Sequence, residues 1–132
     1  MPEQQSHPEV REAVARLCAD YPDEYWREKD RDKAYPGEFV QALTDAGYLS
    51  VLIPEQYQGA GMDLAAACAV LEEIQRSGAN GAACHAQMYI MGTLLRHGSD
   101  AQKQKYLPDI ASGALRLQAF GVTEPSSGTD TT

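Results

Sequence analysis

Hydrophobic residues recur along most of the chain at the three-to-four-residue spacing of an amphipathic α-helix. Together with capping and turn residues, this spacing predicts helices that begin near Pro8, Asp23, Pro36, Asp63, Asn80 and Ser99. From Leu115 to Thr123 the spacing changes towards two, which is typical of a β-strand. We therefore expect an all-α fold, an orthogonal or up-down bundle of about six helices, with a C-terminal strand that belongs to a truncated β-domain. Residues 1–114 would form the helical domain and residues 115–132 the start of the second domain.

The helix that Asp63 is expected to cap has an apolar stripe and a polar end. The stripe consists of Leu64, Ala67, Leu71 and Ile74, and we expect it to be buried. The polar residues at the end of the helix, which we expect to point into solvent, are Glu72, Glu73, Gln75 and Arg76.

The fifth predicted helix is nearly free of charge from Gly81 to Leu95. A helix of this kind either lies at the centre of a bundle or lines a pocket. Its polar residues are His85, Gln87 and Tyr89, which either make satisfied hydrogen bonds in the core or face a ligand. The histidines have no partner at metal-ligand spacing, so we expect no metal site.

Composition and charge limit the classes of partner. The chain has 132 residues, 43% of them hydrophobic and 23% charged, which is typical of one soluble globular domain. A formal net charge of -8 argues against a nucleic acid or an anionic membrane as a partner. Residues 1–6 lack the features of a presequence, and no apolar run is long enough to span a membrane. We therefore expect a cytoplasmic location.

The chain contains three cysteines, Cys18, Cys68 and Cys84. Their number is odd, no CxxC spacing occurs, and each has apolar neighbours in a predicted helix. We expect all three to be buried free thiols.

The last part of the chain combines the strand-like pattern with a turn rich in small hydrogen-bonding groups. Residues 120–130 read FGVTEPSSGTD. Hydroxyl and backbone groups in such a turn can bind the polar edge of a ring or a phosphate.

Residues 123–130, TEPSSGTD, resemble the T-E-P-x-x-G-[ST]-D signature of acyl-CoA dehydrogenases, flavoenzymes that oxidise acyl-CoA thioesters. Residues 46–59, 71–74 and 98–113 resemble further segments of that family in the same order, through IPEQYQG, LEEI, and QK with YLP. Thr129 stands where serine is commoner in the family, and two serines replace a frequent glycine/alanine pair. These differences leave the subfamily open.

The resemblance implies a three-domain enzyme that binds FAD, of which this chain would be the helical first domain plus the first strand and cofactor turn of the middle β-domain. The residues matching Phe120 to Thr129 would line the FAD, with Val122 and Thr123 at the isoalloxazine ring. Gly128 would let the backbone approach closely. Thr129 would contact both the cofactor and the CoA part of the substrate.

The resemblance also implies the chemistry. A base in the C-terminal domain, beyond Thr132, would remove the α-proton while a hydride leaves the β-carbon for flavin N5. We expect no catalytic residue in this chain, and Glu124 would belong to the structural turn. Gln87, Tyr89 and Met91, on the uncharged helix, would form part of the wall that binds the acyl chain.

The implied partners are an acyl-CoA substrate and an electron-transfer flavoprotein or a similar acceptor, and the full-length protein would be a homo-oligomer. Two alternatives stay open. The same scaffold serves acyl-CoA oxidases and flavin-dependent monooxygenases, and the chain could also be a non-catalytic helical interaction module. The sequence that follows Thr132 would separate them.

Overall fold

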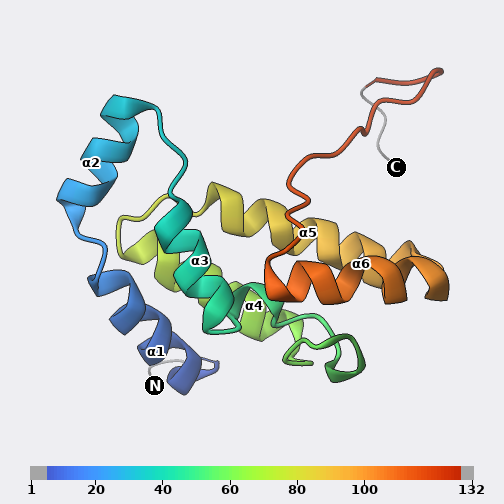
Figure 1. Ribbon diagram of the computed structural model, residues 1–132, viewed down its shortest axis with the longest axis horizontal. Helices are drawn as coiled ribbons and strands as arrows, with labels where there is room; N and C mark the ends of the chain where they lie inside the picture. The colour runs from blue at the N-terminus through green and yellow to red at the C-terminus, as the bar shows by residue number, and fades with distance from the viewer. Residues whose placement is uncertain (1–5, 129–132) are drawn as a thin grey trace, which may run out of the picture.

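The computed structural model describes residues 6–128 of the chain. Six α-helices account for most of these residues (Figure 1). They are α1 (Pro8–Ala19), α2 (Asp23–Asp32), α3 (Gly37–Asp45), α4 (Leu64–Arg76), α5 (Ala82–His97) and α6 (Asp100–Ser112). Two short 3-10 turns, η1 (Tyr48–Ser50) and η2 (Glu55–Tyr57), lie between α3 and α4. The all-helical fold class expected from the sequence is confirmed.

Local hydrogen bonds define several helix ends. Pro8 occupies the first turn of α1, where its missing N–H leaves no helical bond unmade. The Asp63 carboxylate accepts a hydrogen bond from the Ala66 N–H at 2.9 Å and caps α4. Ser99 and Gln102 form a reciprocal capping box at the start of α6, with N···O distances of 3.2 and 2.8 Å.

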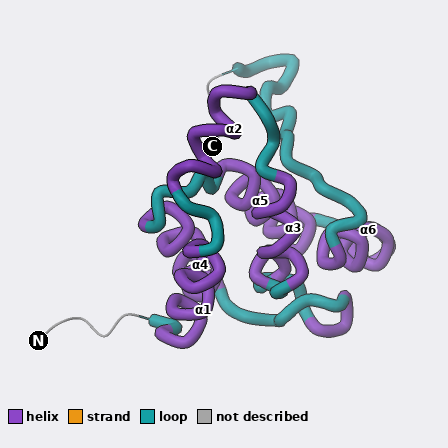
Figure 2. The backbone as a smooth tube through the Cα atoms, turned by 60° about the vertical axis from the view of Figure 1, so that its left-hand side comes forward, coloured by secondary structure: helices purple, strands orange, loops and turns teal. Residues whose placement is uncertain are grey.

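The helices pack around one core. α1 lies along α4, α5 lies beside α6, and α3 contacts both α1 and α6. α2 stands at one side of this bundle, as Figures 1 and 2 show. Fully buried core side chains include Phe39, Leu43, Ile74, Met91 and Leu107. Burying a side chain of this size contributes about 1.5–3 kcal/mol, so this core supplies the main stabilisation of the bundle.

The buried face of α4 differs in part from the expected stripe. Ala67 and Ile74 are buried as expected, but Leu64 is 69% exposed. Leu64 is the first residue of the helix and lies on the same face as Cys68, which is also exposed. Ala66 and Ala69 are buried in its place, because small side chains let neighbouring helices approach closely.

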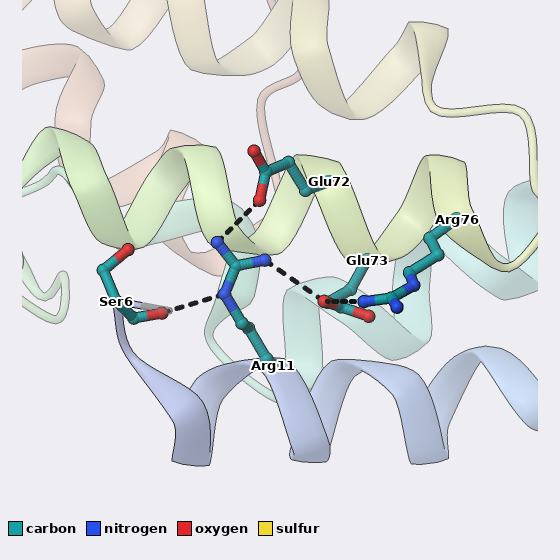
Figure 3. A network of polar contacts seen from close by, with 5 residues as sticks. All are labelled: Ser6, Arg11, Glu72, Glu73 and Arg76. Carbon is teal, nitrogen blue, oxygen red and sulfur yellow. Dashed lines mark hydrogen bonds and ion pairs between the residues drawn. The ribbon is translucent and has the colours of Figure 1, made fainter. Parts of the chain in front are cut away.

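Glu73 was expected to point into solvent, but its side chain is only 9% exposed. Arg11 of α1 reaches between Glu72 and Glu73, with N···O distances of 2.6 and 3.1 Å (Figure 3). The Arg11 Nε also donates to the Ser6 carbonyl at 2.8 Å, and Arg76 lies 3.7 Å from the Glu73 carboxylate. Helix spacing alone could not reveal this ion pair, because Arg11 is distant from Glu73 in sequence.

Replacing Arg11 by methionine is predicted to lower the thermal unfolding midpoint, because the buried Glu73 carboxylate loses its nearest cation. The matched control is Arg16→Met on the same helix, whose pair with Glu12 is exposed, and its effect should be much smaller. The double variant Arg11→Met/Glu73→Met should be more stable than Arg11→Met alone, since it leaves no buried charge unpaired. Equal midpoints for Arg11→Met and Arg16→Met in circular dichroism melts would contradict this assignment.

α2 is attached to the bundle by aromatic contacts and by one carboxylate. Tyr21 and Trp26 each pack edge-on against Phe39, with ring centroids 5.1 and 4.9 Å apart. Glu38 of α3 accepts hydrogen bonds from the Tyr25 hydroxyl at 2.9 Å and from the Lys29 ammonium at 3.3 Å. Its own backbone N–H, then Lys29 and then Tyr25, lower the pKa of the Glu38 carboxyl from 4.5 to about 2.

The lowered pKa of Glu38 predicts a pH-dependent contribution to stability. The ionised carboxylate is favoured in the folded state, so the contribution is complete above the ordinary pKa of 4.5 and is lost as the pH falls towards 2. Glu38→Gln should therefore lower the urea midpoint at about pH 7, and the difference from the parent chain should shrink between about pH 5 and pH 3. Glu28→Gln, on the exposed side of α2, is the control. A difference that stays constant with pH would contradict the role of Glu38.

The three cysteines do not share one environment. Cys18 and Cys84 are buried as expected, but Cys68 is exposed on α4, so that part of the prediction is wrong. Burial raises the pKa of the Cys84 thiol to about 12. Cys68 escapes burial because the neighbouring helices cover only the opposite side of α4, to which Ala66, Ala69 and Val70 belong.

The strand predicted from residue 115 to residue 123 is absent from the described residues. This segment follows α6 and runs past α5 without ladder hydrogen bonds (Figure 1). The one bridge in residues 6–128 joins Glu124 to Ser127 within a turn. A strand needs a partner strand for its backbone groups, and residues 6–128 contain none. The assignment of residues 115–132 to a second domain stays a prediction.

Candidate functional site

α5 separates the core from two surface hollows. Its inward side contributes Cys84, Gln87, Met88 and Met91 to the core. Its other side carries the residues of the two hollows, which lie next to each other and share Tyr89. Helical geometry explains the division, since residues three or four positions apart fall on one face.

The first hollow has a volume of about 660 Å³ and lies between α5 and the linker from α2 to α3. On the α5 side it is lined by three alanines, Ala82, Ala83 and Ala86. Tyr35 and Gln118 face them from other segments. The small alanine side chains leave the helix surface accessible to a ligand.

The second hollow has a volume of about 520 Å³ and lies where the segment after α6 passes α5. It is lined by His85, Tyr89, Ile90 and Thr93 of α5 and by Phe120, Gly121 and Val122. Phe120 and Val122 are 65% and 54% exposed and lie together at this hollow, where exposed apolar side chains form a patch. This hollow therefore presents an open apolar surface.

Tyr89 joins the two hollows. Its hydroxyl donates to the Gln118 carbonyl at 3.4 Å, and its ring lies edge-on to Phe120 with the centroids 5.3 Å apart. The His85 ring also lies edge-on to the Tyr89 ring, with the centroids 5.2 Å apart. Of the three residues predicted to form the acyl wall, Tyr89 is the one that lines a hollow.

Gln87 and Met91 lie on the core side of α5 and do not line either hollow. Gln87 is 1% exposed and donates to the Leu49 carbonyl at 3.3 Å, while its own carbonyl oxygen accepts from Arg116 at 3.4 Å. Met91 is completely buried. Of the two alternatives given above, satisfied hydrogen bonds in the core or contact with a ligand, Gln87 therefore matches the first.

Two side chains of the segment after α6 hold it to the bundle by hydrogen bonds, while Leu115 and Leu117 pack against the core. Arg116 donates to Gln41 of α3 at 3.1 Å, to Thr44 of α3 at 3.1 Å, and to Gln87. The Gln118 amide donates to the Tyr35 hydroxyl at 3.1 Å and to the Ala83 carbonyl at 3.3 Å. These contacts place residues 120–122 against α5.

The other predicted cofactor residues follow this segment. The backbone N–H groups of Gly121, Val122 and Thr123 make no hydrogen bond within residues 6–128. Glu124 lies in the turn, where its N–H donates to the Ser127 carbonyl at 3.0 Å. Gly128 is the last described residue, and a Cβ there would lie 4.0 Å from Thr123. Thr129 lies outside the described residues.

Arg116 and the alanines of α5 were not singled out from the sequence. Arg116 is a single charge between Leu115 and Leu117, and it shares the two-residue spacing of Gln118 and Phe120. That spacing places Arg116 on the same side as Gln118 but does not say which side faces the bundle, since Leu115 and Leu117 on the other side also pack against the core. The alanines gave no signal, because alanine occurs on both faces of helices.

Two further findings concern metal sites and membrane-crossing helices in the described part of the chain. Within residues 6–128, no cluster of three or more histidine, cysteine or carboxylate side chains is arranged to hold a metal ion. None of the described helices combines the length and the hydropathy needed to cross a membrane.

Residues 4–114 match the sequence model described as "Acyl-CoA dehydrogenase, N-terminal domain". Acyl-CoA dehydrogenase FadE12 of Mycobacterium tuberculosis (strain ATCC 25618 / H37Rv) is 34% identical over 122 residues. Glutaryl-CoA dehydrogenase of Desulfococcus multivorans is 36% identical over 128 residues. Both alignments cover 92% of this chain and 31% of the relative, so the chain spans about a third of the length of these relatives.

Solved structures agree with the sequence comparison. The structure of glutaryl-coenzyme A dehydrogenase in complex with glutaryl-CoA matches with a TM-score of 0.77 and 31% identity, over 99% of this chain and 35% of that one. Butyryl-CoA dehydrogenase from Megasphaera elsdenii shares the fold with a TM-score of 0.73 at 23% identity, over 99% of this chain and 36% of that one. Because the family match spans most of the chain and the helical fold is shared, this chain belongs to the acyl-CoA dehydrogenase family and contains its N-terminal domain.

Proposed function

We propose that this chain forms the N-terminal part of an FAD-dependent acyl-CoA dehydrogenase, which oxidises the Cα–Cβ bond of an acyl-CoA thioester. The main support is the course of residues 120–122 across α5. It brings the start of the segment that carries the family signature next to an apolar helix face with alanine-lined space. The family membership of the chain supports the same conclusion.

The residues around the second hollow fit a flavin ring. A flavin is flat and aromatic, with hydrogen-bonding groups along its edges. The hollow offers apolar side chains, and the backbone N–H groups of residues 121–123, at and next to it, make no hydrogen bond within residues 6–128. Phe120, Val122, Thr123 and Gly128 would hold FAD from this chain, together with Thr129. When bound, FAD would supply an acceptor for the hydride.

In this function the chain would bind and orient the flavin and the substrate and would exclude water from the site. It would not transfer the proton. The Ala82, Ala83 and Ala86 side of α5, with Tyr89, would form one wall of the acyl site. Backbone N–H donors near the ring would stabilise negative charge that develops during the reaction. The base that removes the α-proton would lie beyond Thr132.

The partners follow from the family and are part of the proposal. The substrate would be an acyl-CoA, since Thr129 matches the family position that contacts both the cofactor and CoA. The electron acceptor would be an electron-transfer flavoprotein or a protein of similar chemistry, and the full-length protein would be a homo-oligomer.

The first prediction of this proposal concerns the chain by itself. The purified 132-residue chain should bind FAD weakly and should not reduce a dye with acyl-CoA, because it contains only part of the cofactor site. A chimera in which this chain replaces the matching region of the Desulfococcus multivorans relative should retain flavin and regain acyl-CoA-dependent dye reduction. Stoichiometric flavin absorbance with dye reduction by the chain alone would contradict the first expectation. A folded chimera without flavin would contradict the proposed function.

The second prediction concerns the alanine-lined hollow. Ala86→Leu in the chimera should fill part of the hollow and raise the KM for acyl-CoA about tenfold, which corresponds to about 1.4 kcal/mol, while flavin absorbance stays unchanged. Ala101→Leu on the exposed side of α6 adds the same volume and is the matched control. An unchanged KM across acyl chain lengths would exclude Ala86 from the acyl wall.

A further inference from the structure

Arg116 is held in an unusual way for a charged residue. Its guanidinium donates to three neutral oxygens, those of Gln41, Thr44 and Gln87. None of the ion pairs within residues 6–128 includes it. The planar guanidinium holds its N–H donors in a fixed arrangement and can bond to several acceptors at once. The ammonium of a lysine holds its donors in a less defined geometry.

The acceptors of Arg116 come from two different helices. Gln41 and Thr44 belong to α3, and Gln87 belongs to the core side of α5. Arg116 itself lies on the segment that joins α6 to residues 120–122. One side chain therefore fixes three parts of the fold relative to one another.

The turn before Arg116 supports the same geometry. Gly113 ends α6 with a φ of 81°, in the left-handed region. A Cβ at this position would lie 2.8 Å from the Thr44 Cγ2 and 3.0 Å from the Arg116 Nη2. The absence of a side chain at Gly113 thus leaves room for the guanidinium to reach α3.

We propose that Arg116 is a positioning residue for the cofactor segment: by binding Gln41, Thr44 and Gln87, it sets where Phe120 and Val122 lie on α5. The consequence for flavin binding rests on the proposed function. The geometric part concerns this chain alone. Gln118 is a second, neutral anchor of the same segment, and Leu115 and Leu117 pack against the core, so loss of Arg116 loosens residues 119–122 without releasing them completely.

The geometric part can be measured in the 132-residue chain without flavin. Cys68 is exposed while Cys18 and Cys84 are buried, so a spin label at Cys68 and a second at Ala119→Cys report the distance from α4 to the segment. We expect one narrow distance distribution in the parent chain. In Arg116→Met, the fraction of molecules in which the segment has moved away from α5 should rise about tenfold, as expected from loss of hydrogen bonds to a charged group.

Arg27→Met is the matched control, because it removes the same charge from an exposed position on α2. It should leave the distribution narrow. Arg116→Lys should give an intermediate width, since an ammonium keeps the charge but not the planar fork. A narrow distribution in a folded Arg116→Met chain would overturn the proposal.

A milder variant covers the case in which Arg116→Met does not fold. Gln41→Leu removes one exposed acceptor of Arg116 and should widen the distribution with little loss of helix content. Gln41 also donates to Asp45 at 2.7 Å, so Asp45→Ala is its control and should leave the distribution narrow. Equal distributions in Gln41→Leu and the parent chain would overturn the proposal.

Flavin binding is the second readout, measured in the chimera with the Desulfococcus multivorans relative. Arg116→Met should raise the flavin dissociation constant about tenfold and should change the visible flavin spectrum, while Arg27→Met changes neither. A chimera that never retains flavin would contradict the proposed function and leave the label distances to decide the role of Arg116. A loosened segment with unchanged flavin affinity and spectrum would overturn the link between Arg116 and the cofactor.

Discussion

The two-sided environment of α5 is the constraint on which the rest of the site depends. Its core side packs Met91 and Cys84 into the bundle and uses Gln87 for buried hydrogen bonds. Its opposite side, with Ala86 and Tyr89, stays open. A helix that was hydrophobic on all sides would be buried completely, and one without a buried side would not be held in place. The open surface exists because the other side is fixed.

The segment after α6 depends on the same helix. It has no partner strand among residues 6–128, and its backbone is tied to the helices only at its start, where the Leu115 N–H donates to the Asp109 carbonyl at 3.0 Å. Beyond that point side chains determine its position: Arg116 and Gln118 bond to the helices, Leu117 packs against the core, and the ring of Phe120 lies against Tyr89. An arginine bonded to neutral oxygens is well suited to this role, because it needs no buried carboxylate and its bonds are charge-assisted.

The predictions from the sequence succeeded where the controlling interactions are local. The capping box at Ser99 and the N-cap at Asp63 join residues three apart, so sequence spacing reveals them. Four segments, of which the last contains Glu124, indicated the family, and the match of residues 4–114 confirms the family. Predictions failed where the packing of distant elements decides: Glu73 is buried because Arg11 of another helix reaches it, and Leu64 is exposed because it lies with Cys68 on the uncovered side of α4.

The sequence by itself therefore predicted the helices and their caps, and its motifs, including the one at the end of the chain, indicated the family. It also narrowed the candidate residues on α5 to a few, but it could not separate Tyr89 from Gln87 and Met91. Only the tertiary structure decided this, because the direction of a helix face depends on which elements cover it. The role of Arg116 also required the fold, since its acceptors on α3 and α5 are brought together by packing and not by spacing along the chain.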